Sequence, residues 1–305
     1  MKTKISLALT AAVFALSVPS QAQIAAPIHI LPVIAKVSGA ANTDWVTSLS
    51  VSNVGDLEGD VSALFFRESQ SNIPFLNPTE VFSLEPGKTL SVTDVLGSWF
   101  PTQGDTKGFL VLLAEPSDGS EEVVMLTSAG RIFNNADPSA TYGQTVPSTL
   151  LSLAVAPGVS VMPGAQWDDA VRTNVGVLNL TLRPLDVLVT IYDADGAVLA
   201  TATRRIRTFS LGQWSLAQLG VENLGTPGLV EVSVDPDTIT WDPCYEGTDL
   251  DLDDLGGLFM AYMSRVDQVT GDAEFVQGQT DWLDWLGLCG EPALSVVQRL
   301  PFGRR

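Results

Sequence analysis

Apolar and polar residues alternate along most of this chain, and the alternation predicts β-strands. Between Trp45 and Asn53, for example, Leu49 and Val51 are separated by a single serine. A period of two residues is typical of a strand that buries one face. Turn-forming residues such as Glu85-Pro86-Gly87 separate successive runs, and no long helical period appears. The pattern therefore predicts an all-β fold built as antiparallel sandwiches.

One block of this pattern occurs twice. Trp45–Arg67 lies over Val171–Asp193 without a gap, at a constant shift of 126 residues (171 minus 45), and Asn53 falls on Asn179. Two copies one domain length apart predict tandem β domains. The strands expected in the first copy are His29–Val37, Trp45–Asn53, Val61–Arg67, Thr79–Leu84, Lys88–Thr93, Gly108–Ala114, Val123–Phe133 and Thr141–Val146.

The mature length suits two domains of about 120 residues each. We expect the first domain at residues 23–147, a linker containing prolines and glycine at 148–163, and the second domain at 164–280. The second copy differs from the first by an acidic insertion at 235–257 and by a C-terminal extension at 281–305. Single helical turns are expected at matching corners, Asp94–Gly97 and Ala217–Gly220.

Residues 1–22 have the pattern of a cleaved signal peptide. Lys2 and Lys4 precede an apolar run that ends at Val18, and Ser20-Gln21-Ala22 supplies small residues before the cleavage point. This run is too short to span a bilayer, and no later segment is long and apolar enough. We expect export to the periplasm, the cell surface or the medium, with the mature chain starting at Gln23 and no membrane insertion after cleavage.

The charge balance narrows the class of partner. The whole chain has 16 basic and 35 acidic residues, for a net charge of −19. Without Lys2 and Lys4 the mature chain has 14 basic residues against 35 acidic ones, or −21. A surface this negative repels phosphate backbones and anionic lipids, so nucleic acid and membrane partners are not expected.

The chain has two cysteines, Cys244 in the insertion and Cys289 in the extension. An even count in an exported protein predicts a disulfide, with two free thiols as the alternative. The bond would close a loop of 45 residues (289 minus 244), which the chain-entropy model values at about 4 kcal/mol. It would tie the insertion to the extension. A metal site is disfavoured because no histidine lies near the cysteines to complete a tetrahedral shell.

The insertion is rich in carboxylates, and Ca²⁺ prefers six to eight oxygen ligands. The candidate ligands are Glu246, Asp249, Asp251, Asp253 and Asp254. Their spacing opens like an EF-hand loop but then departs from it, because Asp254 stands where glycine is expected and Met260 where glutamate is expected. The alternative is a solvated acidic loop that binds no metal, and in that case the chain has no cofactor.

Tryptophans offer a second candidate binding surface, because flat rings stack on sugars. Trp282 and Trp285 share one face of a short helix expected after Thr280, and Trp241 lies beside the acidic segment. Large aromatic residues are more often buried. Trp45 and Trp214 lie within strand patterns and are expected in the core.

Catalytic patterns are weak in this sequence. His29 is the only histidine and is expected to be structural or exposed, and no partners for a Ser–His–Asp arrangement can be chosen. Arg131 and Arg265 fall at equivalent positions of the two copies and are expected to pair with carboxylates or to cover apolar surface. We therefore expect that the protein is not an enzyme.

The phrase Leu84-Glu85-Pro86-Gly87-Lys88-Thr89-Leu90, following a strand that ends in Asn53-Val54-Gly55, resembles the exported bacterial Ig-like, adhesion-type tandem repeats. The resemblance covers most of the first copy; in the second, Ser210-Leu211-Gly212-Gln213 keeps the glycine but lacks the proline. It implies two Ig-like β-sandwich domains and a surface, adhesion or spacer role. The group has no shared catalytic residues to carry over.

These observations predict an exported, non-enzymatic structural or binding module of the cell envelope or extracellular space. Its partner would be a protein or a glycan at the cell surface. One alternative is a Ca²⁺-dependent glycan- or protein-binding adhesin that uses the insertion and the tryptophans. Another is a surface subunit that self-assembles by pairing an edge strand, with Ile28–Val37 as the candidate.

Overall fold

The computed structural model describes residues 25–39, 43–72, 79–100, 104–136, 142–150, 158–234 and 257–280. Within these ranges most residues lie in β-strands, in antiparallel sheets of nine, five and four strands. The predicted all-β antiparallel class is confirmed. Helical structure in this part of the chain is limited to α1 (Val95–Ser98) and the 3₁₀ turn η4 (Ala217–Leu219), where single turns were expected. None of the described helices is long and apolar enough to cross a membrane.

The first half of the molecule, residues 25–150, forms two layers of strands. Its strands are β1 (Ile28–Ser38), β2 (Asp44–Asn53), β3 (Gly59–Arg67), β4 (Thr79–Leu84), β5 (Thr89–Val92), β6 (Thr106–Pro116), β7 (Leu126–Asn134), β8 (Gly143–Pro147) and β9 (Thr149–Leu150). One layer has the order β4-β3-β6-β1-β9 and the other has the order β5-β2-β7-β8. The layers belong to one nine-stranded sheet because Val37 and Ser38 at the end of β1 pair with the start of β2.

The second half, residues 158–280, has the same strand order in two separate sheets. Its strands are β10 (Val159–Trp167), β11 (Val171–Asn179), β12 (Leu185–Tyr192), β13 (Val198–Ile206), β14 (Ser210–Ser215), β15 (Leu224–Val234), β16 (Phe259–Asp267), β17 (Ala273–Gln277) and β18 (Gln279–Thr280). The sheets run β13-β12-β15-β10-β18 and β14-β11-β16-β17. Read in these orders, the strands of the two halves correspond one to one: β13 takes the place of β4 at one end of the first sheet, and β17 takes the place of β8 at the end of the second. Inside the predicted linker, Thr149–Leu150 forms β9 and Val159 begins β10.

A buried asparagine closes one corner of the first half. Asn53, at the end of β2, is 1% exposed. Its Nδ2 donates to the carbonyls of Leu57 (2.7 Å) and Leu84 (2.8 Å), and its Oδ1 accepts from the amide of Gly55 (3.0 Å). One side chain therefore provides hydrogen-bond partners for three backbone groups at this bend.

The equivalent corner of the second half is closed in the same way. Asn179, at the end of β11, is fully buried. Its Nδ2 donates to the carbonyls of Arg183 (2.6 Å) and Arg207 (3.0 Å), and its Oδ1 accepts from the amide of Thr181 (3.0 Å). The two corner asparagines are the pair that the sequence repeat superimposes.

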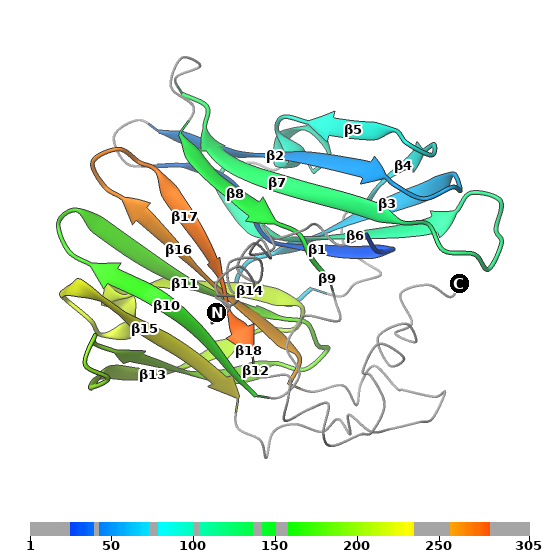
Figure 1. The fold of residues 1–305 in the computed structure, drawn as a ribbon. Helices are drawn as coiled ribbons and strands as arrows, with labels where there is room; N and C mark the ends of the chain where they lie inside the picture. Colours follow the sequence, from blue (N-terminus) through cyan, green and yellow to red (C-terminus); the bar gives the residue numbers. More distant parts are fainter. Residues whose placement is uncertain are drawn as a thin grey trace, which may run out of the picture.

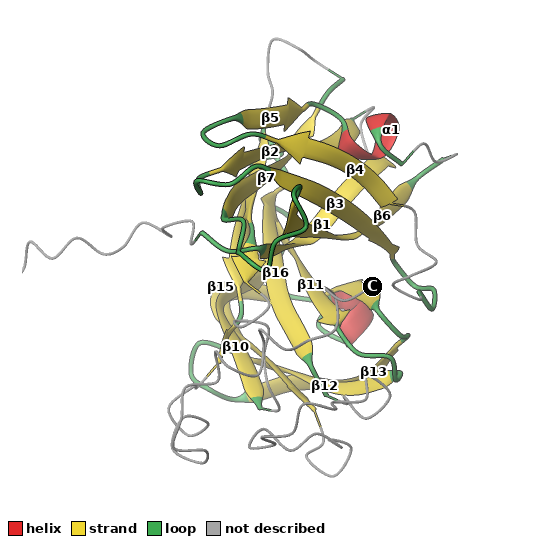
Figure 2. Ribbon diagram, turned by 90° about the vertical axis from the view of Figure 1, so that its right-hand side faces the viewer, coloured by secondary structure: helices red, strands yellow, loops and turns green. Residues whose placement is uncertain are grey.

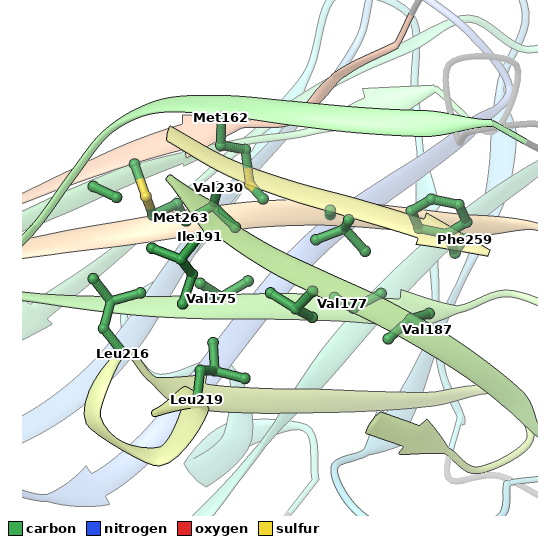
Figure 3. Close-up of a cluster of buried hydrophobic side chains, with 14 of the residues drawn as sticks. Met162, Val175, Val177, Val187, Ile191, Leu216, Leu219, Val230, Phe259 and Met263 are labelled. Carbon is green, nitrogen blue, oxygen red and sulfur yellow. The ribbon is translucent and has the colours of Figure 1, made fainter. Parts of the chain in front are cut away.

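Buried apolar side chains form three cores, and the layers of strands that enclose them are seen in Figure 1. The first-half core lies between the two layers of that half, and the second-half core lies between its two sheets, where Val175, Val177 and Met263 meet Val187 and Val230 (Figure 3). A third cluster, which we call the seam core, joins the halves. It contains Ile30, Val33, Ala35, Phe66, Phe109, Ile132, Val146, Leu178, Leu180, Phe209, Leu211, Met260 and Tyr262.

The seam core lies between two layers, β3-β6-β1 from the first half and β14-β11-β16 from the second, and Ile132 of β7 and Val146 of β8 add to it. Figure 2 shows β1, β3 and β6 above β11 and β16. Strand β3 shows how this works, because Phe65 enters the first-half core while the next residue, Phe66, points to the seam. The Phe66 ring stacks on Phe109 with centroids 4.6 Å apart and lies 5.6 Å from Phe209 of the other half. The two halves therefore share buried surface as the layers of a single domain do.

The structure corrects the expectation that Ile28–Val37 is an edge strand. β1 pairs with β6 on one side, and on the other with β9 at its start and β2 at its end. The register of β1 against β6 shifts between Leu31 and Ile34, and Pro32 lies within this bulge, where a missing amide hydrogen does not break a regular ladder. This strand is central and is not open to pairing with another chain.

Candidate functional site

The predicted ligands and the predicted disulfide lie outside the described residues. These are Glu246, Asp249, Asp251, Asp253 and Asp254 for Ca²⁺, Trp241, Trp282 and Trp285 for sugars, and Cys244 with Cys289. The described residues that flank the insertion are Val234, which ends β15, and Leu258, whose carbonyl accepts from the amide of Leu180 at 3.0 Å. The insertion therefore enters and leaves near the Asn179 corner. Across the described ranges, no group of three or more His, Cys, Asp or Glu side chains is placed to hold a metal ion.

A connected set of polar side chains that crosses between the halves lies at the edge of the seam core. Lys107 of β6 donates through Nζ to Gln213 Oε1 of β14 at 2.7 Å and pairs with Glu68 Oε1 at 3.1 Å. Gln213 Nε2 in turn donates to the hydroxyl of Tyr262 on β16 at 3.2 Å. We call these four residues the seam cluster. Two come from each half, and the hydrogen bond between Lys107 and Gln213 is the one that crosses the boundary.

Burial controls the ionisation of the seam cluster. It raises the pKa of Glu68, and the neighbouring Lys107 opposes this shift. Burial also raises the pKa of Tyr262 well above 10, with the charge of Glu68 adding to the effect, so the phenol stays protonated at neutral pH. Because the folded state binds a proton on Glu68 more tightly than the unfolded chain does, this group alone favours folding as the pH falls. The cluster supplies contacts between the halves rather than a free nucleophile or base.

Backbone hydrogen bonds fasten one edge of the seam. The amide of Ser69 donates to the carbonyl of Leu211 (3.1 Å), and the amide of Asn72 donates to that of Thr208 (2.9 Å). Asn72 Nδ2 also donates to the carbonyl of Phe209 at 2.6 Å. Ser69 and Phe209 have φ values of 58° and 41°, the only positive values among the described non-glycine residues. Such conformations cost about 1–3 kcal/mol each and persist where surrounding contacts hold them.

Side chains fasten the opposite edge. Ser264 of β16 donates through Oγ to Gln144 of β8 at 2.9 Å in a buried position. Thr149 of β9 donates to Gln277 of β17 at 3.0 Å. The halves are thus connected by hydrogen bonds on both sides of an apolar centre, an arrangement that opposes hinge motion between them.

The histidine is buried, at 1% exposure, at the start of β1. His29 Nε2 lies 2.9 Å from the carbonyl of Leu126, and Nδ1 lies 2.9 Å from the hydroxyl of Ser148. Ser148 Oγ lies 2.6 Å from the carbonyl of Ser128, to which it can donate. Burial lowers the pKa of His29, and hydrogen bonds with the backbone of Leu126 and Ala26 partly oppose this. The expected structural role for this residue fits these contacts.

The two arginines expected to be equivalent are not. Ser48 pairs with Arg131 across β2 and β7, whereas Asn174, its counterpart at the shift of 126, pairs with Ser264 across β11 and β16. The structural counterpart of Arg131 is therefore Ser264. Arg265 is the next residue along the strand, so its side chain lies on the opposite face. Arg131 lies over the Phe133 ring, 5.4 Å from its centroid, and Arg265 forms an ion pair with Glu274.

Trp45 and Trp214 are half-buried and pack as expected against cores. Trp45 lies against the seam core, and Trp214 lies against the second-half core. The Trp45 ring meets Tyr142 edge to face, with centroids 5.9 Å apart, and its Nε1 donates to Thr43. These rings are engaged with protein rather than arranged as an open stacking platform.

Comparisons with known proteins do not assign this chain to a family. A scan of protein-family models finds no match, and neither does a search of curated proteins. Among solved structures, the chain is similar to a calcium-binding mutant of Bacteroides uniformis beta-glucuronidase 2, with 13% sequence identity and a TM-score of 0.15. The match covers 81% of this chain and 26% of that one, so the chain spans about a quarter of its length. A TM-score this low carries no argument about fold or function.

Proposed function

We propose that the chain is an exported, non-enzymatic structural or binding module of the cell envelope or extracellular space, acting as one rigid body. The observation that carries this proposal is the seam core with its fastenings on both edges. A scaffold must hold its surfaces at fixed positions, and a shared apolar core between halves provides this. The partner would be a protein or glycan at the cell surface, and no cofactor is required.

We propose that this rigid body consists of two tandem Ig-like sandwiches, one in each half. The identical strand order in the two halves supports this, as do the corner asparagines Asn53 and Asn179 with their matching sets of three bonds. The proposed disulfide between Cys244 and Cys289 would add a tied insertion and extension to the second sandwich. A non-enzymatic role is supported by the use of His29, Glu68 and Tyr262 to join elements of the fold.

Export is tested by producing the complete chain, with a C-terminal tag, in a bacterium and separating cytoplasm, periplasm, membranes and medium. We expect the tagged protein outside the cytoplasm, with Gln23 as its first residue by N-terminal sequencing. A control chain lacking residues 2–22 should remain in the cytoplasm. An uncut chain found only in the cytoplasm would overturn the proposed location.

The Ca²⁺-dependent alternative is tested by thermal melts of the mature, oxidised protein in EDTA and then in millimolar Ca²⁺. A ligand that binds only the folded state must stabilise it, by about 2.7 kcal/mol at a hundred times its dissociation constant. A metal site in the insertion would raise the melting temperature, and Asp251→Ala combined with Asp253→Ala would abolish the rise. Equal melting temperatures in both solutions would leave these aspartates as a solvated loop.

A further inference from the structure

The contacts of His29 do not contain enough hydrogens for every donor–acceptor pair when the ring is neutral. If Nε2 carries the hydrogen that is donated to Leu126, then Nδ1 must accept one, and its partner is the Ser148 hydroxyl. That hydroxyl has one hydrogen, which it donates to the carbonyl of Ser128 at 2.6 Å. A protonated ring would satisfy all three contacts, because Nδ1 could then donate to Ser148 while Ser148 donates to Ser128.

Protonation nevertheless places a charge in a buried site. The groups facing the ring are the Leu126 and Ala26 backbone and the Ser148 hydroxyl, and burial and backbone bonds alone account for the change in its pKa. No carboxylate or cation of the described elements β1, β6, β7, β8 or β9 contributes to the shift in the pKa of His29. The cost of burying an unpaired charge exceeds the gain from completing one hydrogen bond. The neutral ring is therefore favoured in the folded structure, where these contacts are formed.

The protonation state of His29 affects two segments, the residues that precede it in the chain and strand β9. The residues before it are held by β7, because Ala26 and Leu126 exchange two backbone hydrogen bonds of 3.0 Å. His29 itself pairs with Leu150 of β9, and the neighbouring Thr149 is bonded to the second half. The N-terminal segment and the connection between the halves thus meet at one titratable side chain.

We propose that His29 and Ser148 form a proton-sensitive latch that holds the N-terminal segment and β9 closed at neutral pH and releases them in acid. An open state exposes the imidazole to water, where it binds a proton at its ordinary pKa of 6.5. Because the folded pKa lies below that value, closure is fully stable above pH 6.5 and weakens as the pH falls through the interval between the two values. This chain has one histidine, so the latch is the only imidazole that titrates there.

The test is amide hydrogen exchange on the mature protein at pH 7.5 and 5.5, corrected for the intrinsic pH dependence of exchange. Protection of residues 25–31 and 143–150 is expected to fall by up to about tenfold at pH 5.5, one unit below the ordinary pKa. Residues 171–179 of β11 should show no such loss. In His29→Gln the loss should disappear, since the amide can still donate to Leu126 but does not titrate. An equal loss in His29→Gln would overturn the proposal.

Ser160→Ala is the matched control. Ser160 is fully buried and pairs with Val232 as His29 pairs with Leu112, so it is the second-half counterpart of the histidine. Its removal should leave the acid response unchanged. If His29→Gln does not fold, NMR titration of the single imidazole in the parent protein decides the question. A ring pKa below 6.5 supports the latch, and a value of 6.5 or higher overturns it.

Discussion

A protein carrying Phe66→Ala is expected to unfold in two thermal transitions where the parent protein unfolds in one. Phe66 is 1% exposed and stacks on Phe109 and Phe209, so it contacts both halves. Truncating a buried phenylalanine costs about 3–5 kcal/mol, through lost burial and the cavity left behind. We expect most of this lost free energy to come from the contacts that make the two halves unfold together. Differential scanning calorimetry measures it directly, as a ratio of calorimetric to van't Hoff enthalpy that rises above one.

Phe65→Ala is the control for this prediction. It is the adjacent residue on β3, is 3% exposed, and faces the first-half core rather than the seam. We expect a comparable loss of stability in the first half while the contacts that couple the halves remain. A Phe66→Ala protein that keeps a single transition, with the same enthalpy ratio as the parent, would show that the seam core does not set the cooperativity of unfolding.

Replacing either corner asparagine by alanine should lower the free energy of unfolding by about 3–5 kcal/mol. Each change removes the hydrogen bonds that one side chain gives to two carbonyls and one amide, at roughly 1–3 kcal/mol for each group left unsatisfied. At Asn179 the Thr181 hydroxyl also lies 3.1 Å from the Arg183 carbonyl, so that corner is expected at the lower end of the range. Urea unfolding of Asn53→Ala and Asn179→Ala measures the loss as a lower midpoint. The aspartate variants should be as damaging at neutral pH, because a carboxylate keeps the shape but would face two carbonyl oxygens without a hydrogen to donate.

Asn223→Ala provides the comparison for the corners. Asn223 is exposed, and a surface substitution of this kind normally changes stability by no more than about 0.5 kcal/mol. Losses below about 1 kcal/mol at both Asn53 and Asn179 would mean that water replaces the side chain in these bends. A large loss at one corner alone would show that the two copies have diverged in how they close.

Much of the fold is visible in the sequence because strand periodicity survives wherever one face is buried. The expected strand Thr79–Leu84 coincides with β4, and the repeat places both asparagine corners in register. The turn at Gly87, with a φ of 72°, was indicated by its Pro-Gly dipeptide. The sequence also contains a sign of the seam, since runs such as Gly108–Ala114 are apolar on both faces, which is typical of strands covered on both sides.

Other features depend on contacts that periodicity does not encode. A continuous apolar run indicates that a strand has two buried faces but does not identify which sheet covers the second one, so the packing of β3-β6-β1 against β14-β11-β16 could not be foreseen. The seam cluster joins Glu68 to Gln213 over a long separation in sequence, with no local pattern to mark it. The face of Arg265 was assigned wrongly because a one-residue error in alignment reverses the side of a strand.

The seam core has a consequence for biogenesis. Its first-half surface, with Ile30, Phe66 and Phe109, is synthesised well before Leu178, Leu211 and Tyr262, which cover it. A first half that closes early therefore presents a sheet of large apolar side chains to its surroundings, and contiguous patches of this kind attract chaperones or other nascent chains. Under the export proposed above, this favours a translocation route that delays folding until both halves are across the membrane.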